Sequence, residues 1–311
     1  MTKASSNTGK GVAALILLTA LFASLSVLAR YLNDDFTILQ QVYLRVMAAV
    51  CIAAVVFRRK IRWQVIRTLP AHEWLIIAFR GFTAYVVGVA LISKAANETL
   101  LGNVSFIAAL PFVPLLGFVI LGEKTTKWKV LFTHGSFLGV VLLSVQEPGN
   151  LLSWEVGDLY AVIATLGFAL AYIARKWHKD NLNNQEMTAL IFVFGIAFTL
   201  ILSLCIGEGV PNLNVSWLIL AGILVGGVLN VANLFLINYA FEHVDAVRAG
   251  NLLNLEAAWG LLFGLVLYQE WPSWRGLIGG CLIIGCVIGM NIYSRREEAK
   301  LAAIHEEAAK T

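Results

Sequence analysis

The feature that most constrains this chain is a series of long apolar segments, which recur from Gly11 to Tyr293. A helix needs about 20 mostly apolar residues to cross the hydrocarbon core of a bilayer. The segments are continuous rather than alternating, so they favour helices over barrel strands. Charged residues make up 14% of the chain, against about a quarter in soluble domains. The sequence therefore predicts an all-α integral membrane protein with no soluble domain.

We predict ten transmembrane helices, five in each half of the chain. In the first half they cover residues 11–32, 38–57, 73–93, 100–121 and 130–146. In the second half they cover residues 157–175, 187–207, 217–239, 246–268 and 276–293. The four cysteines lie inside these apolar segments and have no zinc-type spacing, which indicates small buried side chains rather than a metal site.

The basic residues of the loops predict which side of the membrane each loop occupies. Alternate loops and termini contain 17 Lys and Arg on one side, against three (Arg30, Lys94 and Arg275) on the other. Short cytoplasmic loops carry an excess of Lys and Arg. We therefore predict a multi-pass protein of the cytoplasmic (inner) membrane with both termini in the cytoplasm, which requires an even number of helices. The basic side contains Lys3, Lys10, Arg58, Arg59, Lys60, Arg62, Arg67, Lys124, Lys127, Lys129, Arg175, Lys176, Lys179, Arg295, Arg296, Lys300 and Lys310.

The two halves of the chain resemble each other. Near the end of the fourth segment of each half, a glycine precedes a glutamate by six residues: Gly117 and Glu123, then Gly264 and Glu270. We divide the chain into a first five-helix repeat, 1–146, a second five-helix repeat, 147–293, and a polar cytoplasmic tail, 294–311. Five is an odd number, so the second repeat enters the membrane the other way up. Inverted repeats of this kind are typical of secondary transporters.

The fourth helix of each repeat also carries a more specific pattern. The first has an Asn/Thr-containing entry at 95–101 (AANETLL), followed by Pro111, Gly117 and a terminal Gly122-Glu123. The second has Leu255-Glu256, Gly264 and a terminal Glu270, with Ala257 and Gln269 as departures. With this pattern the chain resembles the drug/metabolite transporter superfamily, of the EamA type.

The resemblance covers nearly the whole chain and implies ten helices in two five-helix repeats around a central cavity. In that family a proline often stands at the position of Ala257, so we expect the ninth helix to be straighter than usual. The resemblance also implies that the third, fourth, eighth and ninth helices line the cavity, together with the first and sixth. We expect the terminal glutamates, Glu123 and Glu270, to cap the N-terminus of the helix that follows each of them.

Four charged residues lie within the predicted membrane helices: Arg45, Arg80, Arg248 and Glu256. Charges in the hydrocarbon are costly and usually functional. Arg80 lies beside Gly81 on a cavity-forming helix, and we predict that it binds an anionic group of a substrate. For Arg45, the alternative to a functional role is pairing with a neighbouring helix during assembly. Arg248 is near enough to the cytoplasmic end of its helix for its side chain to reach the lipid headgroups.

Glu256 is the proton-coupling candidate. At 1.5 Å per residue it lies about 15 Å from the start and about 21 Å from the end of its helical segment, near the middle of the membrane. The alternative is that Glu256 only braces its helix.

Uncharged polar and aromatic residues of the same helices complete the predicted site. Amides in hydrocarbon need partners, which are either neighbouring helices or a ligand, and the sequence leaves both alternatives open. The predicted substrate-binding residues are Arg80, Tyr85, Asn103, Tyr172, Asn230, Asn233, Asn251, Asn254 and Trp259.

The sequence thus favours a secondary transporter for a small polar or amphipathic metabolite, with or without proton coupling. The four membrane charges sum to +2, so an amino acid or related carboxylate is the preferred substrate. A drug or hydrophobic-cation exporter is the competing transport function, and a membrane scaffold or sensor is the alternative outside transport.

No phosphate loop, HExxH, GxSxG or metal-ligand cluster is present in the sequence. We therefore expect no enzyme activity, no cofactor, no metal and no nucleic-acid partner. The expected partners are a small-molecule substrate and the lipid bilayer. The small-xxx-small motifs at Gly135/Gly139 and Gly285/Gly289 pack helices closely, either within one chain or across a homodimer.

Overall fold

The structure is a computed structural model that describes residues 3–32, 35–98, 104, 107–144, 155–179, 182–268 and 274–308. These residues form helices and connecting turns, and no strand occurs among them. Seven of the described helices are long and apolar enough to cross a membrane. The prediction of an all-helical integral membrane protein is therefore confirmed.

The first half of the chain contains α1 (Lys3–Leu32), α2 (Ile38–Val56), α3 (Trp63–Arg67), α4 (Ala71–Gly81), η1 (Phe82–Ala90), α5 (Leu91–Glu98), α7 (Phe112–Leu121) and α8 (Lys127–Ser144). The second half contains α9 (Val156–Ile173), η3 (Ala174–Trp177), α10 (Asn184–Cys205), α11 (Trp217–His243), α12 (Ala246–Leu253), α13 (Leu255–Tyr268) and α14 (Trp274–Ala308). Side-chain caps determine where several of these helices begin. Thr37 and Asn183 each form a capping box, at the start of α2 and of α10.

Three helices depart from regular α geometry near the middle of the bundle. The segment after Gly81 is a π-helix, η1, which connects α4 to α5, and such widened turns are frequent at functional sites. α7 begins after Pro111, which cannot donate a helical hydrogen bond. The predicted helix 246–268 is interrupted at Asn254, whose carbonyl accepts a tight three-residue bond from the Ala257 amide. Asn254 keeps right-handed helical dihedrals, with φ −62° and ψ −14°, and the expectation of a straighter ninth helix stays a prediction.

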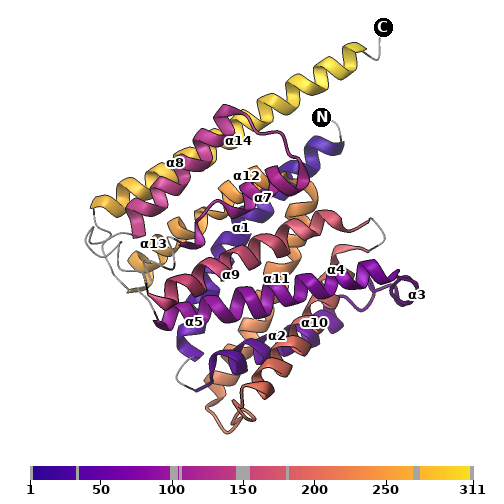
Figure 1. The fold of residues 1–311 in the computed structure, drawn as a ribbon, viewed down its shortest axis with the longest axis vertical. Helices are drawn as coiled ribbons and strands as arrows, with labels where there is room; N and C mark the ends of the chain where they lie inside the picture. The colour runs from indigo at the N-terminus through magenta and orange to yellow at the C-terminus, as the bar shows by residue number, and fades with distance from the viewer. Residues whose placement is uncertain are drawn as a thin grey trace.

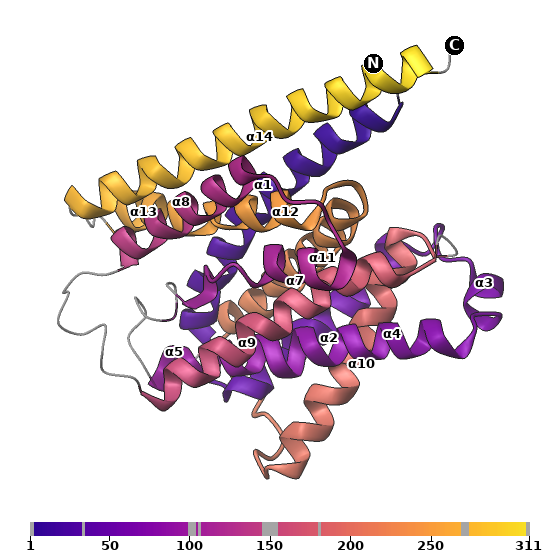
Figure 2. The same ribbon diagram turned by 45° about the horizontal axis from the view of Figure 1, so that its top comes forward.

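Helices of the two halves interlock throughout the bundle. α1 and α2 of the first half pack on α11, α2 also packs on α10, and α5 and η1 pack on α9. α7 packs on α12, and Figures 1 and 2 show α8 and α14 side by side along one edge. Both ends of the chain lie near each other at one end of the bundle (Figure 2).

The small-xxx-small motifs pack within one chain, between α8 and α14. A Cβ atom on Gly139 would lie 2.7 Å from the Gly279 carbonyl oxygen, and one on Gly289 would lie 2.5 Å from the Phe132 ring. One on Gly135 would lie 2.6 Å from the Cys286 sulfur, whereas Gly285 has open space beside it. Close contact between these two helices therefore depends on three of the four glycines.

Candidate functional site

Arg80 is buried inside the bundle, with 1% of its surface exposed. Its guanidinium donates to three helices of the second half: Nε to the Ala171 carbonyl at 2.9 Å, Nη1 to the Met187 sulfur and Nη2 to the Asn238 amide oxygen. Asn238 is oriented in turn by the hydroxyl of Thr188, to which it donates at 3.0 Å. All three acceptors of Arg80 are neutral, so its positive charge has no carboxylate partner among the described residues.

Tyr85 lies near two buried arginines, Arg80 and Arg45. The π-helical turn η1 carries Tyr85 inward, where its ring lies over Gly195 and beside Phe192. Its hydroxyl is close enough to interact electrostatically with both guanidinium groups. Arg45 donates from Nε to the Gln41 carbonyl at 3.0 Å, and the described residues contain no carboxylate paired with it. Two cations and a phenol therefore share one region of the interior.

Glu256 and Tyr172 lie near each other on the other side of this region. Glu256 is in the first turn of α13, where the positive end of the helix dipole favours a carboxylate. Its side chain is exposed on the surface of the described helices. Tyr172 is close enough to interact electrostatically with both Glu256 and Tyr85, and its ring packs on Phe168 and Phe241.

The two predicted amides of α11 differ in their hydrogen bonding. Asn230 donates to the Gly226 carbonyl of its own helix at 2.8 Å. Asn233 is 4% exposed, and neither its amide nitrogen nor its amide oxygen has a partner among the described residues. Both residues lie on the helix face that contains Gly226, which packs on Arg45. A buried amide without partners is costly, so Asn233 is a strong candidate for contact with a substrate.

The remaining predicted site residues are placed elsewhere or are not described. Asn251 donates to the Phe132 carbonyl and Asn254 to the Ser136 hydroxyl, so both amides connect to α8. Trp259 is half-buried, with its ring 6.2 Å from that of Phe263. Asn103 lies outside the described residues. The structure thus places Tyr85 near Arg80 and Arg45, and Tyr172 near Tyr85 and the coupling candidate Glu256.

Two contacts of buried ionisable side chains were not predicted: that of His178 with Glu73, and that of Arg248 with α14. The Nδ1 atom of His178 lies 2.6 Å from Glu73 at the start of α4, and its Nε2 atom has no partner among the described residues. Arg248 was expected to reach the headgroups, but it is fully buried and donates to Asn291 and Glu298 of α14. His178 and Glu73 are 105 positions apart in the sequence, so no local spacing predicts their contact.

Among the described residues no group of three or more His, Cys, Asp or Glu is placed to hold a metal ion. The arrangement is therefore one of charged and aromatic side chains inside a helical membrane bundle. Such intramembrane charges mark substrate or ion pathways, so fold and site together define a polytopic membrane protein of the transport class.

The comparisons with known proteins agree with this class. The profile of the EamA-like transporter family matches the chain twice, over residues 9–145 and 155–292. An uncharacterized transporter of Helicobacter pylori is 22% identical over 283 residues, which cover 88% of this chain and 92% of that protein. A biotin transporter of Escherichia coli K12 is 25% identical over 287 residues, with 88% and 90% covered.

A crystal structure with 17% sequence identity superimposes with a TM-score of 0.73 over 94% of this chain and 99% of that one. At this identity the match shows the fold alone. The two profile matches span most of the chain, and the chain belongs to the EamA-like transporter family.

Proposed function

We propose that this protein is a secondary transporter that moves a small metabolite across the cytoplasmic membrane by alternating access. The proposal includes ten membrane crossings in two inverted halves, with both termini cytoplasmic. Seven described helices are long enough to cross, and α7, α8 and the interrupted pair α12–α13 would supply the other three. The double match to one family profile supports the repeat, and transporters of inverted-repeat type use interrupted helices at their binding sites.

The preferred substrate is an amino acid or a related carboxylate. The observation that carries this preference is the pair of buried arginines, Arg45 and Arg80, which have no carboxylate partner among the described residues and both lie near Tyr85. A buried cation is stabilised by a paired anion, and Arg binds carboxylates in bidentate geometry. Asn233 would supply a further donor and acceptor. The E. coli relative is named for biotin, which also carries a carboxylate.

A hydrophobic-cation exporter is the second candidate. Glu256 favours it, because this carboxylate lies near the Tyr172 ring, and aromatic faces attract organic cations. Glu256 is also the proposed proton-coupling residue. In that role it exchanges a proton as substrate binds, and Glu256→Gln should abolish the dependence of transport on a pH gradient.

The test is a thermal-shift screen of the purified protein, followed by uptake into proteoliposomes. A ligand that binds only the folded state stabilises it by about 2.7 kcal/mol at 100 times its Kd. We expect amino acids and other small carboxylates to raise the Tm and their methyl esters to have no effect. A Tm raised by tetraphenylphosphonium but by no carboxylate would support the cation exporter. No uptake of any stabilising ligand would support a scaffold or sensor.

A further inference from the structure

The terminal glutamate of the first half caps a helix of the other half. We expected Glu123 to cap α8, the next helix, but this prediction was wrong. Its carboxylate accepts from the Ala246 amide at 2.8 and 3.0 Å and from the Val247 amide at 3.3 Å, at the N-terminus of α12. It also pairs with Lys176 at 2.9 Å. Glu270 lies outside the described residues.

The backbone at the end of α7 directs Glu123 toward α12. Gly122 adopts a left-handed conformation with a φ of 63°, which glycine accepts without strain. The Glu123 amide then returns to the Gly117 carbonyl at 3.1 Å, to which the Gly122 amide also donates. The Gly-Glu pair thus ends α7 and orients a carboxylate toward the other half.

The two helices that Glu123 connects are in close contact. A Cβ atom on Gly117 would lie 2.7 Å from the Ala246 Cβ atom, and one on Gly250 would lie 2.5 Å from the Pro114 ring. Each of these helices borders an interruption: α7 begins after Pro111, and α12 ends before Asn254. α7 therefore packs on α12 along Pro114 to Gly117, and Glu123 joins the same two helices just beyond the end of α7.

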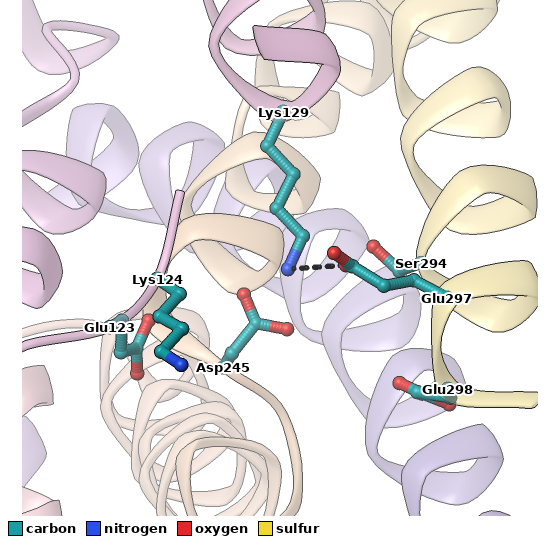
Figure 3. A pocket seen from close by; sticks show the side chains of 7 residues that line it. All are labelled: Glu123, Lys124, Lys129, Asp245, Ser294, Glu297 and Glu298. Atoms are coloured by element: carbon teal, nitrogen blue, oxygen red, sulfur yellow. Dashed lines mark ion pairs between the residues drawn. The ribbon is translucent and has the colours of Figure 1, made fainter. Parts of the chain in front are cut away.

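A polar pocket of about 230 Å³ lies beside this contact (Figure 3). Lys129 of α8 pairs with Glu297 of α14 across it at 3.1 Å. Ser294 is buried there, and its hydroxyl has no partner among the described residues. Lys124 offers a positive charge to a Glu123 carboxylate that has left α12, whereas Asp245, Glu297 and Glu298 are other carboxylates of the same pocket. The pocket is lined by Glu123, Lys124, Lys129, Asp245, Ser294, Glu297 and Glu298.

We propose that the contacts of Glu123 with Ala246, Val247 and Lys176, here called the Glu123 latch, hold the gate between α7 and α12 shut and break when the transporter opens at this end. The inference rests on the proposed alternating access. Charge-assisted bonds to a helix N-terminus are strong but reversible, and these join the two halves. Release of one carboxylate therefore frees α7 from α12 without unfolding either helix.

The experiment measures opening without a substrate. Cys51, Cys205, Cys281 and Cys286 are replaced by serine, and a single reporter, Ala249→Cys, is placed on α12, where the native side chain is fully buried. The rate of labelling by a polar maleimide is followed in detergent. We expect Glu123→Ala to raise this rate about tenfold, because the closed state loses its charge-assisted contacts. A second reporter, Ala53→Cys on α2, is also fully buried and should be unaffected.

Asp245→Ala is the matched control, since Asp245 caps the same helix from within the same half by accepting from the Arg248 amide at 2.9 Å. Faster labelling at position 249 in the Glu123→Ala variant, without faster labelling in the Asp245→Ala variant, supports the latch. An equal effect of Asp245→Ala, or no effect of either, overturns it. If Glu123→Ala also exposes position 53, then Glu123→Gln decides: labelling at 249 alone supports the latch, and labelling at both or neither position overturns it. A chain that opens but transports nothing would disprove only the proposed function.

Discussion

At the residue scale, Arg80 combines two tasks that a single substitution can separate. Its three guanidinium bonds join α4 to α9, α10 and α11, and we propose that its charge also binds an anionic substrate. Lysine keeps the charge but lacks the planar fork that reaches several acceptors at once. We expect Arg80→Lys to remain folded and to lower the rate of transport at least tenfold, as measured by carboxylate uptake into proteoliposomes.

Arg80→Ala should cost more, because it leaves Asn238 and the Ala171 carbonyl without their buried donor. We expect a loss of about 1–3 kcal/mol in the free energy of unfolding, which is usual when a buried neutral acceptor loses its donor. The control is Arg67→Lys on the exposed face of α3. Wild-type uptake by Arg80→Lys would contradict a role in substrate binding.

His178 predicts how stability depends on pH. Burial, and then the nearby positive charge of Arg80, lowers the pKa of His178 from 6.5 to about 4. Its Nε2 atom has no partner among the described residues, which also favours the neutral ring with Nδ1–H donating to Glu73. The unfolded chain binds a proton that the folded chain does not bind between these two values, so stability falls as the pH falls from about 6.5 to 4.

His178→Gln should remove this part of the pH dependence. We expect the Tm of the wild type to fall more steeply than that of the variant between pH 6.5 and 5. Over the full range from pH 6.5 to 4, the wild type should lose on the order of 1–3 kcal/mol more of its free energy of unfolding than the variant loses. The exposed His134 on α8 provides the control, since His134→Gln leaves the buried pair intact. Parallel Tm curves for wild type and His178→Gln would show that the ring is not held neutral.

Single residues also show how far the sequence could go. A charge in an apolar segment is conspicuous, so Arg80, Arg45 and Glu256 were identified from the sequence. The structure buries Arg80 and Arg45, whereas the side chain of Glu256 is exposed. Their partners were not identified, because the Asn238 amide that binds Arg80 is 158 positions away. Pairings over such distances depend on which helix faces meet, and composition and spacing do not encode this.

At the element scale, apolar length predicted most helices, but not their interruptions or packing. The π-helical turn η1 follows Gly81 with no proline to signal it, and the break at Asn254 occurs where Ala257 replaced the expected proline. Within η1, Gly88 packs against Phe168 of α9. Local propensity is a weak guide where such tertiary contacts dominate.

The glycines of the small-xxx-small motifs give a test at this scale. A methyl group on Gly139 would meet backbone atoms of α14, at 2.7 Å from the Gly279 carbonyl oxygen, whereas Gly285 has nothing within 4 Å. We expect Gly139→Ala to destabilise the protein by about 1–3 kcal/mol, as overpacking does. Gly285→Ala should leave the Tm nearly unchanged. Equal Tm values for the two variants would show that α8 and α14 pack differently.

At the scale of the whole molecule, the interlocked halves explain why neither is expected to fold alone. α1 and α2 have their main partners among helices of the second half, and so does α8, which packs along α14. Each half would leave these faces exposed without the other. The boundary at residue 146 therefore marks a repeat in sequence rather than an independent folding unit, and a chain cut there should require co-expression of both pieces.

The orientation of the molecule is the last prediction. Both chain ends lie at one end of the bundle (Figure 2), and the basic loops predict that this end is cytoplasmic because translocating Lys and Arg is disfavoured. A phosphatase that is active only in the periplasm, fused after Thr311, should therefore be inactive. The same enzyme fused after Gly209, in the turn between α10 and α11, should be active, which controls for expression.

Activity at Thr311 with silence at Gly209 would invert the molecule, and it would place the Glu123 latch at the periplasmic end of the proposed transport path. Activity at both positions would be incompatible with an even number of crossings. In the ten-helix arrangement an odd number of helices precedes Gly209, so a periplasmic Gly209 implies a cytoplasmic N-terminus. A periplasmic C-terminus would then require an odd total.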